Sequence, residues 1–363
     1  MDIDLTQSQQ QLREVVARRF GRHGDLLSTA PNARWSEYAK AGLLALNVES
    51  SASELHAGAV ETMIFMEHAG RAGVDDAFVP TVVHTVQVLN SYRQQPLAGD
   101  LIEDIVKGAT RLSVVTGYND PGPGSFVVRP AGSEWVIHGS CDQIMSAAES
   151  DRFLVPARIV DGSGMVLALI DRTSAGLRVQ RKLSWNGQWL GEVLLNNVTV
   201  KAANCFAARA DLTTLLRRAW DHVTAARCAQ TVGVMASLVD FVINSARNDQ
   251  RYQRLASTSQ AMRVEVAEMK MALELARSSS MAAACACRHR LEADREIAVS
   301  RAKVQINRTG TTMVRLASQL LGNSVQNNDR ASAIFSTLIV AEQLHGDDSF
   351  HLGRLVAHAE ATL

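Results

Sequence analysis

The distribution of proline is the feature that most restricts how this chain can fold. All seven prolines lie at or before Pro156, so the last 207 residues (363 − 156) contain none. A proline in a helix interior costs about 3 kcal/mol, and a stretch this long without proline permits long, uninterrupted helices. Apolar residues recur there at helical spacing and predict helices over about 211–247, 257–290, 292–321, 329–344 and 348–361. We therefore expect a bundle of long antiparallel helices at the C-terminal end.

The middle of the chain has a different period. Between residues 111 and 204, β-branched or alternating runs are separated by Gly, Pro, Asn, Asp and Ser, which is typical of short strands and turns. The runs predict strands over about 111–118, 125–130, 134–139, 152–160, 164–171 and 191–200. Strands at this spacing indicate a small antiparallel β-barrel or sandwich.

The first 110 residues return to helical spacing. Thr6 and Gln9 have the spacing of a capping box that opens the first helix. Further helices are predicted over about 33–44, 53–70, from Pro80 onward, and over 98–107. The predicted fold class is α+β, with an N-terminal helical domain (1–110), a middle β-barrel domain (111–204) and a C-terminal helical bundle (205–363). We expect these three segments to pack as one compact unit.

Composition excludes several classes of partner. Lysine plus arginine and aspartate plus glutamate each number 37, so the formal net charge is zero and neither a nucleic-acid surface nor an anionic membrane is indicated. The first residues show no basic segment followed by an apolar one, so we expect no secretory signal peptide. We also expect no membrane-spanning helix. The five cysteines are odd in number and form no C-x-x-C pair, which argues against a disulfide framework and a zinc site. We expect a cytoplasmic, reducing location and no bound metal.

Several stretches of sequence resemble the acyl-CoA dehydrogenase family. The similar stretches are LTQSQQQLREVVARRF (5–20), WSEYAKAGLLAL (35–46), WVIHGSCDQIMSAAESDRFLVPAR (135–158) and SARNDQRYQRLASTSQAMRVEVAEM (245–269). The resemblance implies the helix–barrel–bundle subunit of that family, with FAD held between the barrel and the bundle of one subunit and its neighbour. It also implies an acyl-thioester substrate, on CoA or a carrier, whose α-proton goes to a base while the flavin accepts the β-hydride.

The resemblance also assigns cofactor contacts. The loop GYNDPGPGS (117–125) aligns with the family's flavin-cradling loop, and a plain turn between two strands is the alternative interpretation. Asp249 stands where the family has an arginine on the neighbour's FAD diphosphate; nearby arginines could replace it, or could form a solvated basic face at a helix end. The cofactor contacts implied by the alignment are Asp120, Gly124, Ser125, Met145, Ser146, Arg247, Arg251, Gln319 and Gly322.

The catalytic base is where this sequence departs most from the family. The residue aligned with the family's glutamate is His345, and Glu342 lies one turn before it. Some relatives place the base in the first bundle helix, where Asp221 is the nearest carboxylate. A histidine base would suit neutral pH, because imidazole ordinarily titrates near 6.5. The non-catalytic alternatives are a solvated surface charge for Asp221 and a helix-capping role for His345.

Three functions therefore stay open. The first is a flavin-dependent acyl-thioester α,β-dehydrogenase or one subunit of it; the second is a non-catalytic partner subunit; the third is a flavin-free biosynthetic cyclase or isomerase on the same scaffold. Wide apolar faces on the C-terminal helices predict a homo- or hetero-oligomer with a related subunit through the bundle. The residues of those faces are Leu316, Leu320, Leu321, Ile334, Phe335, Leu338 and Ile339.

Overall fold

The computed structural model describes residues 5–20, 29–49, 58–117, 122, 125–162, 164–183, 189–209, 211–248, 260–288, 292–322 and 328–360. Contacts group the chain into two compact units. The helical unit comprises Met1–Thr29, Ala59–Asp75 and Thr224–Leu363, and the sheet unit comprises Ala30–Gly58 and Asp76–Val223. The expectation of one compact unit is thus replaced by two, and the predicted N-terminal domain is shared between them.

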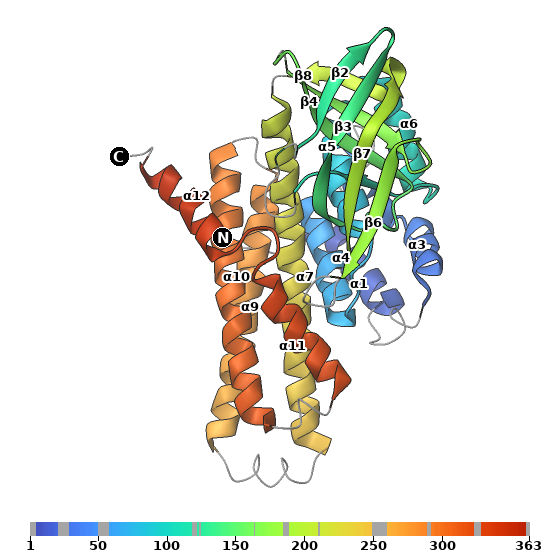
Figure 1. The fold of residues 1–363 in the computed structure, drawn as a ribbon. Helices are drawn as coiled ribbons and strands as arrows, with labels where there is room; N and C mark the ends of the chain where they lie inside the picture. Colours follow the sequence, from blue (N-terminus) through green and yellow to red (C-terminus); the bar gives the residue numbers. More distant parts are fainter. Residues whose placement is uncertain are drawn as a thin grey trace. The chain divides into compact units, whose positions relative to one another are not determined.

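The described part of the sheet unit forms a sheet of eight strands, most of which are labelled in Figure 1. They are β1 (Leu112–Val114), β2 (Val127–Ala131), β3 (Glu134–Met145), β4 (Arg152–Ile159), β5 (Met165–Asp171), β6 (Leu177–Leu183), β7 (Trp189–Lys201) and β8 (Cys205–Arg209). Their order is β6-β7-β3-β2-β4-β5-β8, with β1 beside β4. Most pairs are antiparallel as predicted, but β1 and β2 each pair with β4 in parallel. The strand-rich domain is confirmed, and the purely antiparallel description is wrong for these two pairs.

One hydrophobic core lies inside this sheet. Alternate residues of β4, such as Phe153 and Val155, pack with Val193 and Leu195 of β7, because successive side chains of a strand point to opposite faces. The intervening residue Leu154 is also fully buried, so β4 is covered on both faces. A strand buried on both faces reads as a continuous apolar run, which is the pattern that made this segment visible in the sequence.

Short helices complete the sheet unit. They are α3 (Pro31–Lys40), η1 (Leu43–Ala45), the π-helical stretch η2 (Val79–Thr85), α5 (Val86–Asn90), α6 (Pro96–Val106) and η3 (Ala202–Asn204). The hydroxyls of Thr81 and Thr85 both donate hydrogen bonds to the carbonyl oxygen of Leu112, at 2.9 and 3.2 Å. These bonds tie η2 to β1 at the place where the sheet begins.

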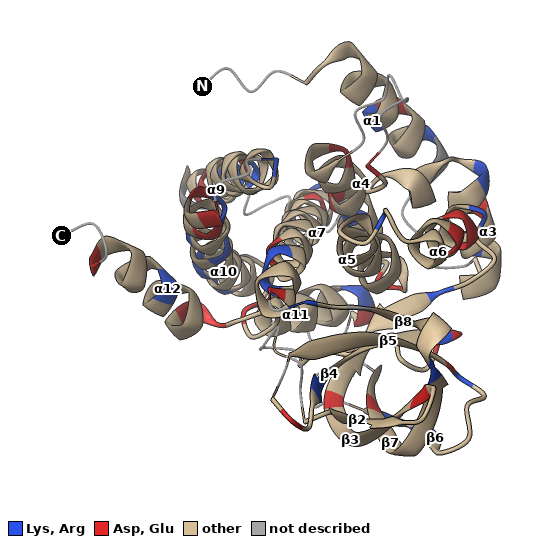
Figure 2. Ribbon diagram, turned by 90° about the horizontal axis from the view of Figure 1, so that it is seen from above, with Lys and Arg blue, Asp and Glu red and all other residues tan. Residues whose placement is uncertain are grey.

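The helical unit consists of long helices (Figure 1). They are α1 (Gln7–Phe20), α4 (Ala59–Ala72), α7 (Leu212–Asn248, which enters this unit at Thr224), α9 (Gln260–Ala286), α10 (Glu292–Leu321), α11 (Asp329–Ala341) and α12 (Asp348–Glu360). Figure 2, which views the unit from above, shows α10 beside both α9 and α12. The capping box is confirmed, since the Thr6 N–H donates to Gln9 Oε1 at 2.9 Å and the Gln9 N–H to Thr6 Oγ1 at 3.3 Å.

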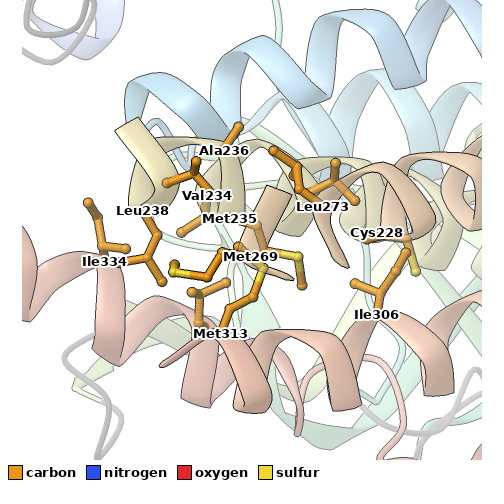
Figure 3. Close-up of a cluster of buried hydrophobic side chains, with 14 of the residues drawn as sticks. Cys228, Val234, Met235, Ala236, Leu238, Met269, Leu273, Ile306, Met313 and Ile334 are labelled. Atoms are coloured by element: carbon orange, nitrogen blue, oxygen red, sulfur yellow. The ribbon is translucent and has the colours of Figure 1, made fainter. Parts of the chain in front are cut away.

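The bundle core contains the residues from which an oligomer was predicted. Figure 3 shows part of this core, where Met235, Met269, Met313 and Ile334 lie together. Within the predicted apolar faces, four side chains are at most 7% exposed and belong to the same core: Leu316, Leu321, Ile334 and Leu338. Leu320 and Phe335 pack against it, so among these residues only Ile339, 48% exposed, is left for a partner. The bundle itself thus buries four of these seven side chains and covers part of two more, so these faces leave less apolar surface for a partner than the sequence indicated.

Helix α7 bears on the expectation that no helix spans a membrane. Among the described residues it is the one helix whose length and apolar composition would allow it to cross a membrane. However, 72% of its most apolar stretch is buried inside the structure, as in the core helix of a packed bundle.

Two glycines allow α4 and α7 to touch. A Cβ atom on Gly70 would lie 1.9 Å from the carbonyl oxygen of Gln230, and one on Gly233 would lie 2.0 Å from that of Glu67. Neither distance is possible for real atoms, so the two backbones are in direct contact at these positions. Glycine is required here for close approach, although it weakens an isolated helix.

We predict that Gly233→Ala destabilises the protein, because the added methyl group would force the backbones of α4 and α7 apart. Overpacking of this kind typically costs about 1–3 kcal/mol, and contact with backbone places this case at the upper end. Gly353→Ala in α12 is the matched control, since a Cβ there meets nothing within 4 Å. It should raise stability by up to about 1 kcal/mol. Urea unfolding measures both, and equal midpoints for the two variants would refute the close-contact argument.

A second prediction concerns acid stability. Burial lowers the pKa of His84, in η2, to about 4, and its Nε2 has no hydrogen-bond partner among the described residues. The native state therefore binds fewer protons than the unfolded state between pH 4 and about 6.5, so stability falls as pH drops through this window. His84→Phe should remove about 2 kcal/mol of the loss that wild type shows between pH 7 and pH 5. His138→Gln, at an exposed position on β3, is the control, and an unchanged pH slope in His84→Phe would contradict the assignment.

Candidate active site

Ser125 was predicted as a cofactor contact, and in the structure its hydroxyl binds the sheet instead. Its Oγ donates to the carbonyl oxygen of Ser140 and accepts the Ser140 N–H at 3.1 Å. The neighbouring Gly139 permits this, since a Cβ there would lie 2.7 Å from the Ser125 carbonyl oxygen. The hydroxyl thus anchors the residue to β3. Asp120 and Gly124, from the same predicted loop, lie outside the described residues.

Met145 and Ser146 lie at the turn that follows β3. The turn is fixed by hydrogen bonds to its backbone: Ser113 Oγ donates to the Met145 carbonyl at 3.3 Å, and Ser150 Oγ donates to the Ser146 carbonyl at 2.9 Å. The hydroxyls of Ser113 and Ser150 lie 2.7 Å apart, and Arg172 Nη1 donates to the Ser150 carbonyl at 2.9 Å. Ser146 is half-buried with φ +51°, and its own hydroxyl has no partner within the described chain. It is therefore available to a ligand, as the prediction requires.

Asp221 is completely buried in the sheet unit, on the first turns of α7. The adjacent Trp220 and His222 are also buried, at 3% and 7% exposure. The expectation of a solvated surface charge at Asp221 is therefore wrong, because the helix face that carries it is covered. A carboxylate is buried only where other groups compensate its lost hydration, which makes this position a site candidate in its own right.

The predicted cofactor contacts of the helical unit lie at helix ends. Arg247 is exposed in the last turn of α7, and Gln319 is exposed in the last turn of α10. Gly322 follows α10 with φ +52°, the left-handed conformation that commonly ends a helix. A Cβ on it would meet nothing within 4 Å, so its backbone is open to a ligand. Arg251 and Asp249 lie outside the described residues.

Glu342 and His345 lie together in the turn between α11 and α12. Glu342 is half-buried, and its carboxylate accepts a hydrogen bond from Thr311 Oγ1 at 3.2 Å. His345 is 4% exposed with φ +58°, a backbone conformation that is uncommon for any residue except glycine. Its carbonyl oxygen lies 2.9 Å from the Nε2 of His351, and that ring's Nδ1 lies 3.1 Å from Ser300 Oγ.

A buried polar stripe on α10 faces this turn, and residue-by-residue reasoning from the sequence missed it. Ser300, Lys303 and Asn307 are each at most 4% exposed, at helical spacing on a face that is otherwise apolar. Burial lowers the pKa of Lys303 to about 8, although Cys228 and the carboxylates of Asp348, Glu342 and Asp347 act in the opposite direction. Burial likewise lowers the pKa of His351 to about 4. Polar residues at i, i+3 and i+7 within an apolar helix face were the available signal.

The described residues fit FAD in part. Ser146 offers a free hydroxyl and Gly322 an open backbone, whereas the Ser125 hydroxyl is already committed to Ser140. Hydroxyl and backbone N–H donors of this kind are what a flavin ring and its pyrophosphate would need.

The chain is similar to known proteins over its whole length. A family model described as the C-terminal domain of acyl-CoA dehydrogenase matches residues 214–358. The probable acyl-CoA dehydrogenase YngJ of Bacillus subtilis (strain 168) is 23% identical over 344 residues, which cover 89% of this chain and 90% of that protein.

Solved structures agree with the sequence matches. The ChsE4-ChsE5 complex from Mycobacterium tuberculosis contains a chain that superposes with a TM-score of 0.84 at 19% identity, with 100% of each chain covered. The FAD complex of PigA superposes with a TM-score of 0.86 at 17% identity, again with 100% of each chain covered. Identities this low show the fold alone, which confirms the helix–sheet–helix class predicted from the sequence. The family model thus places residues 214–358 in the acyl-CoA dehydrogenase family, and the full-length relative and the shared fold make the whole chain similar to distant members of that family.

Proposed function

We propose that this chain is a subunit of an FAD-dependent acyl-thioester α,β-dehydrogenase in which His345 is the catalytic base. The proposal rests on the burial and backbone conformation of His345 in the α11–α12 turn. The resemblance places the catalytic base in this turn. His345 is buried there, in a left-handed backbone conformation held by the hydrogen bond that its carbonyl oxygen accepts from His351 Nε2. Uncommon backbone conformations that the surroundings fix in this way concentrate at functional sites.

The chemistry assigned to this chain is proton transfer and orientation. A neutral imidazole nitrogen of His345 takes the α-proton of the thioester, for which imidazole is suited near neutral pH. When bound, FAD supplies the acceptor for the hydride that leaves the β-carbon. The Ser146 hydroxyl, which has no partner within the described chain, is assigned to the flavin.

We also propose that the chain works with a related subunit. Homologous proteins form complexes of two different chains, as in the ChsE4-ChsE5 complex. In this chain three apolar side chains of α9 lie exposed at spacings of seven and four residues, which puts them on one helix face: Val264, Met271 and Leu275 at 47%, 68% and 61%. An apolar stripe of this kind on a soluble helix supports burial against another protein. A cytoplasmic location belongs to the same proposal and is supported by the five free cysteines.

A non-catalytic partner subunit is the second candidate. It is favoured by the engagement of two predicted site groups elsewhere, since Ser125 binds Ser140 and Glu342 accepts from Thr311. Under this alternative the base and the main cofactor contacts come from the related subunit. The two candidate functions predict different effects of replacing His345 on the turnover of acyl-thioester oxidation.

His345→Gln should lower the turnover of acyl-thioester oxidation about 10²–10⁴-fold, because it removes the proton acceptor and keeps the size of the side chain. Glu342→Gln is the matched control in the same turn and should change turnover less than tenfold. Single-turnover kinetics with an artificial electron acceptor measures both. A large effect of Asp221→Asn alone would place the base on α7 instead. Full activity in all three variants would favour the non-catalytic partner.

The cofactor proposal has its own test. The protein, purified alone or co-expressed with a related subunit that keeps the family's glutamate, should be yellow and should release FAD on denaturation. Mass spectrometry of the released small molecules identifies the cofactor independently of activity. Ser146→Ala should reduce FAD retention, since it removes a ligand hydrogen bond worth about 1 kcal/mol. Ser125→Ala should affect retention less, as that hydroxyl binds β3. A colourless protein in both preparations would contradict the proposal.

A further inference from the structure

The polar stripe on α10, formed by Ser300, Lys303 and Asn307, makes hydrogen bonds to only one part of the helical unit among the described residues. Lys303 Nζ donates to the carbonyl oxygen of Ala341 and to Asn307 Oδ1, the latter at 2.9 Å. Asn307 Nδ2 donates to the Glu342 carbonyl at 3.2 Å and to Asp348 Oδ1 at 3.0 Å. Every hydrogen bond that leaves the stripe thus reaches the end of α11, the turn after it, or α12.

Ser300, the third residue of the stripe, reaches the turn indirectly, through His351. Its hydroxyl lies 3.1 Å from Nδ1 of His351, whose Nε2 lies 2.9 Å from the His345 carbonyl oxygen. Ser300 and His351 have no exposed surface, so water does not compete for these bonds. Three successive points of the chain, the end of α11, Glu342 and His345, are therefore held by side chains that originate on or rest against α10.

The turn needs such support because its backbone is unfavourable. His345 has φ +58° and Gly346 has φ +89°. A Cβ on Gly346 would lie 2.7 Å from Phe350 and 2.8 Å from His351 Nε2, so the backbone also passes close to α12. Conformations of this kind persist only where surrounding contacts determine them.

The stripe is a poor device for stability. Burying an ammonium group costs more than its hydrogen bonds to neutral oxygens return, and apolar residues of similar volume are often as stable or more stable. Lys303 is 4% exposed, and the described structure gives it no ion pair. What a buried polar group of this kind supplies is orientation of the groups that it binds.

We infer that Lys303 and Asn307 are positioning residues that fix the α11–α12 turn, and through it the orientation of His345. The catalytic meaning of this inference rests on the proposed function, whereas the positioning itself concerns only contacts within the helical unit. Neither residue touches the reacting atoms in this account. Both act through the backbone of the turn.

Two variants test the inference. Lys303→Met keeps the length of the side chain and removes its donors, and Asn307→Leu does the same for the amide. Hydrogen exchange of the amides in residues 342–347 should accelerate at least tenfold in both, while exchange in the middle of α10 stays unchanged. Lys270→Met, at an exposed position on α9, is the matched control and should alter none of these.

Kinetics separates positioning from packing. Under the proposed function, Lys303→Met should lower kcat about 10–100-fold with KM nearly unchanged, because a displaced base costs turnover rather than binding. Unchanged exchange in residues 342–347 would overturn the inference, whatever the activity. Faster exchange with full turnover would overturn its catalytic meaning. If the wild-type protein oxidises no thioester, the proposed function fails, and the exchange experiment alone still decides the positioning.

Discussion

The direct backbone contact between α4 and α7 is the constraint on which the helical unit depends. Gly70 and Gly233 are 163 residues apart in sequence (233 − 70), and each leaves the room that the other helix's backbone fills. Helix α1 joins the unit through α4, where Gln9 Nε2 donates to the buried Glu61 carboxylate at 2.8 Å. Between α4 and Thr224 the chain builds the sheet unit, so the helical unit is closed by contacts between its N-terminal and C-terminal parts. Such non-local contacts form late and slowly in folding.

Sequence periodicity located most elements because each pattern is local. Apolar spacing predicted α7, α9, α10, α11 and α12 nearly to their ends, and the capping box predicted the start of α1. It missed β6 and β8; in β6 the apolar alternation of Leu177 and Val179 is interrupted by Arg181, and most of the strand is exposed. The grouping into two units was also invisible, because it depends on glycines whose role appears only once two distant helices meet.

The sequence named candidate site residues but could not show their contacts. The resemblance brought Glu342 and His345 to attention, and the structure places both in one turn. It could not show that Ser125 is committed to Ser140, because this bond depends on how β3 bends past Gly139. The alternative interpretation of Asp221 as a surface charge rested on the usual solvation of a charge on a helix, whereas packing around the first turns of α7 buries it.

The ionisation of Lys303 links the turn to proton binding. In the closed structure burial lowers the pKa of Lys303 to about 8, against an ordinary value of 10.5. Opening the turn would expose the ammonium group to water and return its pKa toward the ordinary value. The closed turn therefore binds this proton less tightly than an open one, and linkage requires that closure is favoured as pH rises from about 8 toward 10.5. The fall in the pKa of Lys303 is limited by groups that raise it: the carboxylates of Glu342 and Asp347 in the turn, that of Asp348 on α12, and Cys228 on α7. Below pH 8 both states carry the charge, so the hydrogen bonds of Lys303 and Asn307, rather than a change of protonation, hold His345 in place.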